Sequence, residues 1–198
     1  MTDFNDAVLK QSLGPLSKDQ NLAFGLLLCE RMMPALSRFA RHTSFNDSIY
    51  QGCLNNAWRH FAGNTSPSNY GELAEACLNG APDTEEFDHP LTSAALNTAL
   101  SVGAAMSFLA DYDVDHLVEA AGLARDTAAL YAQSVKAAPP RSLGFKEVME
   151  HPIVQQELRR QADDVRFLQS LPKDISQEMI QLIKERAEQA SALLPPEN

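Results

Sequence analysis

The stretch LTSAALNTALSVGAAMSFLA, residues Leu91–Ala110, decides the fold. It contains no charged residue and no proline, in a chain of which 21% of the residues are charged. Its apolar side chains fall on every side of a helix, so this helix is either buried in a core or spans a membrane. Polar residues such as Asn97 interrupt it, and Asp88 and Asp111 flank it, whereas membrane spans are flanked by Lys or Arg. We therefore predict an all-α protein, a multi-helix bundle packed around this central helix, with no membrane span.

One side of the central helix carries only small residues. They stand four positions apart, which is helical spacing: Ala95, Ala99, Gly103 and Ser107. Another helix can approach closely along such a row. Packing within the chain is the favoured interpretation, and a contact between subunits is the alternative.

Apolar spacing and capping residues predict further helices along the rest of the chain. Pro34 either kinks the second helix or begins a new one that ends at His42. Asp174 is predicted to cap the last helix in a capping box with Gln177. No alternating pattern typical of a strand is present. The predicted helical ranges are 4–13, 17–33, 47–62, 66–79, 114–138, 143–150, 152–170 and 174–193.

The helices are predicted to form a single domain over residues 1–198. Pro139-Pro140 is the best internal boundary. The helices after it look too polar to hold a core alone, so we expect them to pack on the earlier ones.

Charge and cysteine content narrow the functional classes. Sixteen Lys and Arg face 26 Asp and Glu, which gives a net charge of −10. Nucleic-acid binding needs a concentrated basic footprint, and anionic membrane surfaces attract basic segments, so both partners are disfavoured. The three cysteines, Cys29, Cys53 and Cys77, form no close pair in sequence and predict free thiols. Together with an N-terminus that does not look like a secretory signal, they lead us to expect a cytoplasmic protein.

The acidic residues suggest no metal site of a familiar kind. Of the five histidines, only His89 follows a Glu by three positions, and the di-iron bundle signature needs such a pair on each of two helices, so that signature is missing. Asp111, Asp113 and Asp115 alternate as in a calcium loop, but His116 and Gly122 stand where that loop needs Gly and Glu. We interpret the three aspartates as helix caps, and we predict no metal and no cofactor.

A second acidic pattern supports an enzymatic alternative. Glu72-x-x-Glu75 and Glu85-x-x-Asp88 resemble the magnesium site of all-α nucleotide pyrophosphatases, in which two such pairs face each other from neighbouring helices. Residues three apart share a helical face, so two pairs can hold metal ions and a triphosphate. Only nine residues separate the pairs here, and no Lys or Arg lies near to bind phosphate. The competing interpretation is two solvated acidic turns.

Glu30 and Arg31 are the most informative charged pair. They interrupt an apolar run directly before Pro34. Glu30 either faces solvent or is buried, and a buried Glu30 requires an Arg or helix-terminal amides as partner, because an unpaired buried charge costs several kcal/mol. The pair either anchors a kink structurally or contributes to a binding site for a small molecule.

Three blocks of residues carry a family pattern. They are Cys29-Glu30-Arg31-Met32-x-Pro34 with Phe39, Thr43, Phe45, Asp47, Ile49-Tyr50 and Trp58; Phe87-Asp88; and Pro152-x-Val154-x-x-Glu157. This pattern resembles the YjaG-like family of bacterial proteins, domain of unknown function 416, over nearly the whole chain. The resemblance implies an all-α fold in a bacterial cytoplasm. It assigns no activity, so no catalytic residue is transferred to this chain.

These observations favour a helical binding or interaction protein without enzymatic activity. The chain has a large apolar content and no recognisable reaction centre, and symmetric pairs are the commonest soluble assembly, so we expect a homodimer. The alternative is a metal-dependent nucleotide hydrolase that uses Glu72, Glu75, Glu85 and Asp88. A third hypothesis is a small-molecule pocket at Glu30, Arg31 and the Pro34 break.

Overall fold

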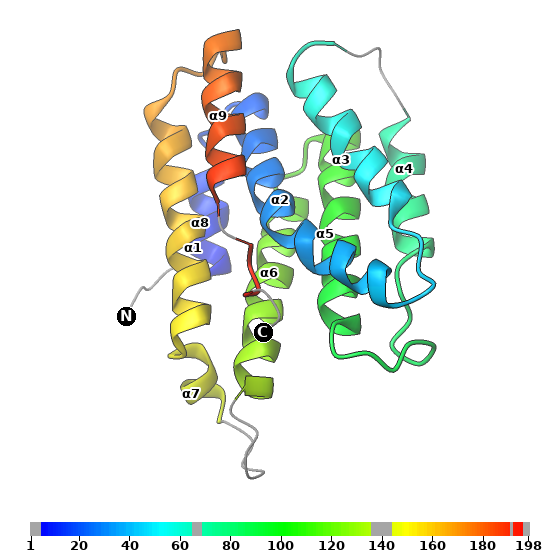
Figure 1. Ribbon diagram of the computed structural model, residues 1–198. Coiled ribbons are helices and arrows are strands. Elements are labelled where there is room, and N and C mark those ends of the chain that lie inside the picture. Colours follow the sequence, from blue (N-terminus) through cyan, green and yellow to red (C-terminus); the bar gives the residue numbers. More distant parts are fainter. Residues whose placement is uncertain (1–4, 65–68, 136–143, 191, 196–198) are drawn as a thin grey trace.

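The computed structural model describes residues 5–64, 69–135, 144–190 and 192–195. Within these ranges the chain forms helices and no strand, which confirms the predicted all-α class (Figure 1). The helices are α1 (Asp6–Leu13), α2 (Lys18–His42), α3 (Ser48–Phe61), α4 (Tyr70–Asn79), α5 (Thr92–Asp111), α6 (Asp115–Val135), α7 (Phe145–Met149), α8 (Pro152–Ser170) and α9 (Gln177–Gln189).

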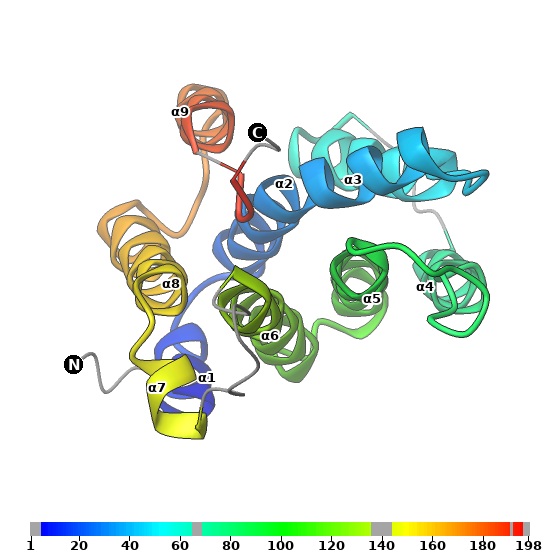
Figure 2. The same cartoon turned by 60° about the horizontal axis from the view of Figure 1, so that its bottom comes forward.

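Helix α5 is the central element that the uncharged stretch predicts. It lies between α4 and α6, and α2 and α3 cover one side of it (Figure 2). The helix is long and apolar enough to cross a membrane, but 67% of its most apolar window is buried inside the fold. The surrounding helices therefore remove its apolar surface from water, which is the main stabilising contribution in a bundle of this kind.

The row of small residues on α5 is the contact surface for α4. A Cβ atom added at Gly103 would lie 3.3 Å from the Cβ atom of Cys77 and 3.6 Å from the carbonyl oxygen of Ala74. Ala99 lies one turn before Gly103 and Ala95 two turns before it, and both are fully buried. The close helix approach that the sequence predicts is therefore a contact within the chain.

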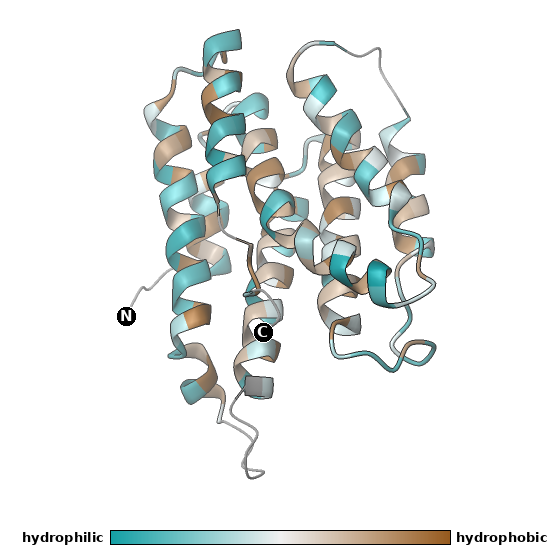
Figure 3. Cartoon of the chain, viewed as in Figure 1, coloured by the Kyte–Doolittle hydropathy of each residue, from teal (hydrophilic) through white to brown (hydrophobic). Residues whose placement is uncertain are grey.

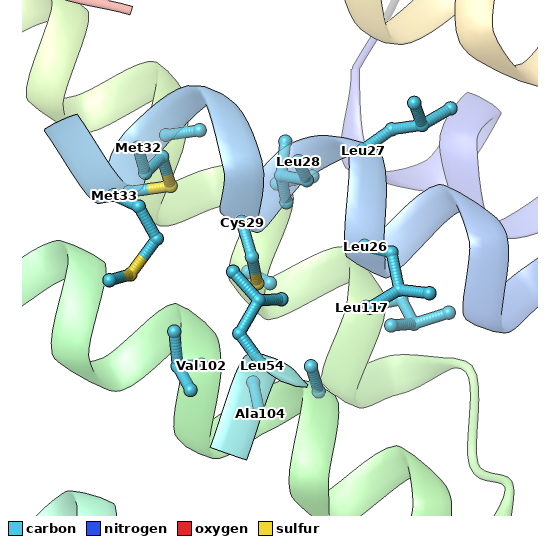
Figure 4. Close-up of a cluster of buried hydrophobic side chains, with 14 of the residues drawn as sticks. Leu26, Leu27, Leu28, Cys29, Met32, Met33, Leu54, Val102, Ala104 and Leu117 are labelled. Carbon is cyan, nitrogen blue, oxygen red and sulfur yellow. The ribbon is translucent and has the colours of Figure 1, made fainter. Parts of the chain in front are cut away.

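Helix α2 is the second buried helix. Every residue from Leu22 to Cys29 is buried, including Gly25, so this half of α2 has no solvent face. Figure 4 shows Leu26 of α2 beside Leu117 of α6, and Met33 of α2 directed toward Val102 of α5. The sequence pattern suggested an amphipathic stripe, but α3, α5, α6, α8 and α9 all pack against α2.

Pro34 kinks α2 and does not end it. The helix runs through Pro34 to His42, and its direction changes along its length (Figure 1). Proline removes one backbone amide and tilts the carbonyl groups of the preceding turn away from the helix axis. Two of these carbonyls accept hydrogen bonds from elsewhere: Leu193 N donates to Arg31 O at 2.8 Å, and Thr98 Oγ1 donates to Met32 O at 3.3 Å. The kink thus binds both α5 and the segment 192–195.

The two helices of the C-terminal part pack on the earlier ones, as the sequence predicts. Helix α8 packs against α6 and α2, and α9 packs against α2. The outer faces of both are hydrophilic (Figure 3). The predicted cap at Asp174 is wrong, because Ser176 accepts the amide of Met179 and α9 begins at Gln177.

Three other expected boundaries fall outside the described residues. These are the Ser66-Pro67 entry of α4, the end of α6 beyond Val135 and the Pro139-Pro140 break. Asn69 caps α4 through the amide of Glu72.

Candidate functional site

Arg31 is the centre of a buried charged network. Its side chain is only 3% exposed. One guanidinium nitrogen, Nη1, lies 2.5 Å from Asp164 Oδ2, and the other, Nη2, lies 3.2 Å from Glu157 Oε1. Burial alone would lower the pKa of the Arg31 guanidinium, but the charges of these two carboxylates raise it above its ordinary value. Arg31 therefore stays ionised inside the protein.

The network ties four helices together. Asp164 uses its second oxygen to accept Arg186 Nε of α9 at 2.8 Å. Gln161 donates from Nε2 to Glu157 Oε1 at 3.0 Å and to the Ala121 carbonyl oxygen of α6 at 3.1 Å. Breaking such a buried pair leaves a charge without a partner, which is strongly destabilising. The network therefore fixes how α2, α6, α8 and α9 pack.

The acidic and amide members of this network were not predicted from the sequence. Glu157, Gln161 and Asp164 recur at spacings of four and three, so they share one face of α8 with Leu168. This spacing is the signal that could have identified them, because it places polar residues on a face that also carries a fully buried leucine.

The Glu30 side chain lies on the opposite side of α9 from the Arg31 side chain. It is half-buried and accepts a hydrogen bond from Trp58 Nε1 at 2.7 Å. With Trp58, Asn55 and Lys184 it lines a cavity of about 360 Å³, and the Lys184 ammonium lies 5.8 Å from the centre of the Trp58 ring. Glu30 is thus neither fully buried nor paired with an arginine.

Arg31 lines a separate cavity of about 270 Å³. Arg160, Asp164 and Arg186 also border it. Residues of α9 border both cavities: Arg186 lines the cavity at Arg31, and Lys184 lines the one at Glu30. The structure therefore brings both predicted residues to cavities at the α2–α9 contact, and their role in binding a ligand stays a prediction.

The four carboxylates of the hydrolase hypothesis do not gather into a site. Glu72 and Glu75 are exposed on α4, whereas Glu85 and Asp88 are exposed in a connection that is not helical. The second pair therefore lacks the shared helical face on which the hypothesis depends. In the part of the chain that the structure describes, no three His, Cys, Asp or Glu side chains are arranged to hold a metal ion.

Asp113 caps the start of α6, as predicted, whereas Asp111 is the last residue of α5 and Asp115 lies in the first turn of α6. Asp111 accepts the amide of Asp113 at 2.8 Å, and Asp113 accepts the amide of Asp115 at 3.0 Å. The Asp113 amide and the neighbouring His116 ring lower the pKa of the Asp111 carboxyl. These bonds connect the end of α5 to the start of α6.

The three cysteines are free and buried. Cys53 of α3 and Cys77 of α4, distant in sequence, place their sulfur atoms 3.6 Å apart, with the Cys77 thiol donating to Cys53. That hydrogen bond lowers the pKa of Cys53 and raises that of Cys77. Burial raises the pKa of Cys29 to about 12, so this thiol stays protonated at neutral pH.

Comparison with known proteins identifies the family. The model of the family described as "Protein of unknown function (DUF416)" matches residues 8–192. The chain belongs to the DUF416 family. This confirms the resemblance to YjaG-like proteins that the Cys29–Pro34 block suggested. DUF416 members with curated sequences include the uncharacterised YjaG proteins of Salmonella typhimurium and Salmonella typhi, each 25% identical over 167 residues, 83% of this chain and 82% of theirs.

A solved structure shares the DUF416 fold. The crystal structure of a DUF416 family protein from Shewanella baltica superposes with a TM-score of 0.78 and 16% identity, covering 93% of this chain and 95% of that chain. At this level of identity the likeness shows the fold alone. The two chains therefore share their arrangement of helices.

Proposed function

We propose that this DUF416 protein is a non-enzymatic binding protein of the bacterial cytoplasm, acting as one domain, whose ligand binds where α9 and the segment 192–195 cover α2 and α8. The observation that carries the proposal is the position of Glu30 and Arg31. Each lines a cavity, and the two cavities lie on opposite sides of α9. A pocket with a few converging polar groups is the usual form of a small-molecule site.

The charged groups at this junction favour binding over catalysis. Arg31, Glu157 and Asp164 are engaged with one another and hold helices together. Groups that carry out acid–base or nucleophilic chemistry must instead be free to reach a substrate. The network therefore serves as a rigid support for the cavities next to it.

Native mass spectrometry of the protein purified without denaturation tests this proposal. We expect a mass in excess of the chain, which disappears when the protein is unfolded before the measurement. A bare chain mass, together with no thermal stabilisation by any member of a metabolite library, would contradict it. Hydrolysis of a nucleotide panel with Mg²⁺ or Mn²⁺ would instead support the metal-dependent alternative.

A homodimer is a further proposal, and the exposed apolar residues of α6 and α7 indicate where the two copies would meet. Phe145 is 83% exposed and Leu130 is 45% exposed, and both border an open cavity of about 870 Å³. Large apolar side chains exposed side by side often mark an interaction surface. The two acidic chains repel each other, so added salt should strengthen a dimer held by apolar contacts.

Light scattering over a dilution series tests the dimer. We expect the mass of two chains for the native protein and of one chain for Phe145→Glu. Leu182→Glu, which changes another exposed apolar residue, 46% exposed on α9, is the control that should stay dimeric. A monomeric mass for the native protein at every concentration and salt would reject the proposal.

A further inference from the structure

A cavity of about 690 Å³ lies between the start of α8 and the segment 192–195. One part of its wall is apolar and is formed by Ile153, Leu193 and Leu194. Another part is basic and is formed by Arg159 and Arg160, neighbouring residues of α8. The volume falls within the usual range of roughly 300–1,000 Å³ for sites that bind small molecules.

The charge of this cavity is opposite to that of the protein. Its described lining includes two arginines and no carboxylate, whereas the chain as a whole has a net charge of −10. An anion is therefore repelled by most of the surface and attracted where these guanidinium groups lie. The cavity is at the N-terminal end of α8, a helix of 19 residues, whose dipole adds to the positive potential.

Arg160 has unused binding capacity and is the more buried of the two arginines in this wall. It is half-buried and borders both this cavity and the smaller one at Arg31. Unlike Arg31 and Arg186, it has no ion-pair or hydrogen-bond partner among the described residues. A guanidinium group binds carboxylate or phosphate through two parallel hydrogen bonds, which makes it well suited to an anionic ligand.

His151 adds a second kind of donor to the cavity wall. Its Nδ1 atom accepts the amide of Ile153 at 3.4 Å, which caps α8. The proton of the neutral ring therefore lies on Nε2, which is free to donate to a ligand. The opposite wall is held by one backbone and one side-chain hydrogen bond: Leu193 N donates to Arg31 O at 2.8 Å, and Arg38 Nη1 donates to Pro195 O at 2.7 Å.

We propose that this cavity binds a small amphipathic anion: one carboxylate or phosphate monoester group on an apolar body. Arg160 binds the anionic group, with Arg159 and His151 beside it, and Leu193 and Leu194 contact the apolar body. This inference rests on the proposed function and names the ligand class. The wall has one basic side and one apolar side, which matches a molecule divided in the same way.

Calorimetric titration of the full-length protein with three probes tests the inference. The probes are octanoate, octyl phosphate and the neutral octanol. We expect at least one of the two anions to bind and octanol not to bind. Arg160→Gln should lower the affinity for the anion by about tenfold or more, because a charge-assisted bidentate contact is lost. Arg160→Lys, which keeps the charge without the bidentate geometry, should have an intermediate effect.

Arg166→Gln is the matched control, since Arg166 is exposed on the same helix and pairs with Asp163 away from this cavity. It should leave affinity unchanged. Arg160→Gln should fold normally, because Arg160 has no partner among the described residues to lose, and its melting temperature is compared with that of Arg166→Gln to confirm this. Equal affinity of the Arg160→Gln and Arg166→Gln variants, or binding of octanol as tight as that of the anions, would overturn the inference.

Failure of this inference can be distinguished from failure of the proposed function. If neither anion binds but native mass spectrometry finds another retained ligand, the inference fails and the proposed function stands. If no probe binds and no ligand is retained, both fail.

Discussion

At the scale of single residues, Arg31 is a buried cation whose ion pairs bear on stability. It is paired with Glu157 and Asp164, which are 1% and 3% exposed. Removing only the cation would leave two carboxylates buried in a medium of low dielectric constant. The cost of that state exceeds the stabilisation that the intact ion pairs provide, because desolvation of the charges is no longer offset.

We expect Arg31→Met to lower the free energy of unfolding by about 3–5 kcal/mol, the usual effect of removing one partner of a buried pair. Arg166→Met is the control: its pair with Asp163 is exposed, so its effect should stay within about 1 kcal/mol. Urea unfolding followed by circular dichroism measures both. Equal effects of the two substitutions would show that the buried network does not stabilise the fold.

The raised pKa of Cys29 predicts how the free energy of unfolding changes with pH in the alkaline range. Burial raises its pKa from 9.0 to about 12, so above pH 9 the unfolded chain loses this proton while the native state keeps it. The raised pKa therefore stabilises the folded state fully below pH 9, and this stabilisation is lost as the pH rises toward 12. Between pH 8 and pH 10 the free energy of unfolding should fall by about 1.4 kcal/mol through this residue.

Urea unfolding at pH 8 and pH 10 checks this value in the native protein and in Cys29→Ala. The native protein should lose about 1.4 kcal/mol more between the two pH values than the variant does. Other titrating groups, such as Tyr50, affect both proteins equally and cancel in the difference. The same loss in both proteins would mean that Cys29 titrates normally in the folded state.

At the scale of elements, the sequence predicts helices better than it predicts their partners. Helix α5 could be identified because its uncharged stretch fits either a membrane or a protein core, and its internal polar residues and acidic flanks favour the core. For α8 the helix was predictable, but its buried polar face was not. Its carboxylates meet Arg31, which is 126 and 133 residues away in the chain. No local pattern reports a contact at that separation.

The start of α9 shows a similar limit. Asp174 and Ser176 are both good capping residues two positions apart. The residue that caps is the one at which the chain leaves extended geometry, and Ser176 does so with φ −79° and ψ 165°. Residue preference alone does not distinguish Asp174 from Ser176.

The α4–α5 crossing yields a prediction about packing. Gly103→Leu should lower the free energy of unfolding by about 1–3 kcal/mol, since its side chain would overlap Ala74 and Cys77. Gly52→Leu is the matched control, because nothing lies within 4 Å of a Cβ atom there. It should stabilise α3 by up to about 1 kcal/mol through helix propensity. A neutral effect at Gly103 would place α4 elsewhere.

At the scale of the whole molecule, two buried helices form the support and a polar periphery forms the proposed site. Helices α2 and α5 lie among the other helices (Figure 2). The cavities at Glu30, Arg31 and Arg160 are lined by residues of α2, α3, α8, α9 and the segment 192–195. Binding regions are usually drawn from the less stable parts of a fold. The site is therefore expected to open locally while the core stays closed.

Hydrogen–deuterium exchange of the intact chain tests this division most directly, because amide protection reports local opening free energy. The amides of α5 from Ala95 to Leu109 and of α2 from Leu22 to Cys29 should exchange slowest, near the rate set by global unfolding. The amides of α9 should exchange faster by local opening. Exchange of α5 at the rate of α9 would contradict the claim that the fold is built around a helix enclosed by its own chain.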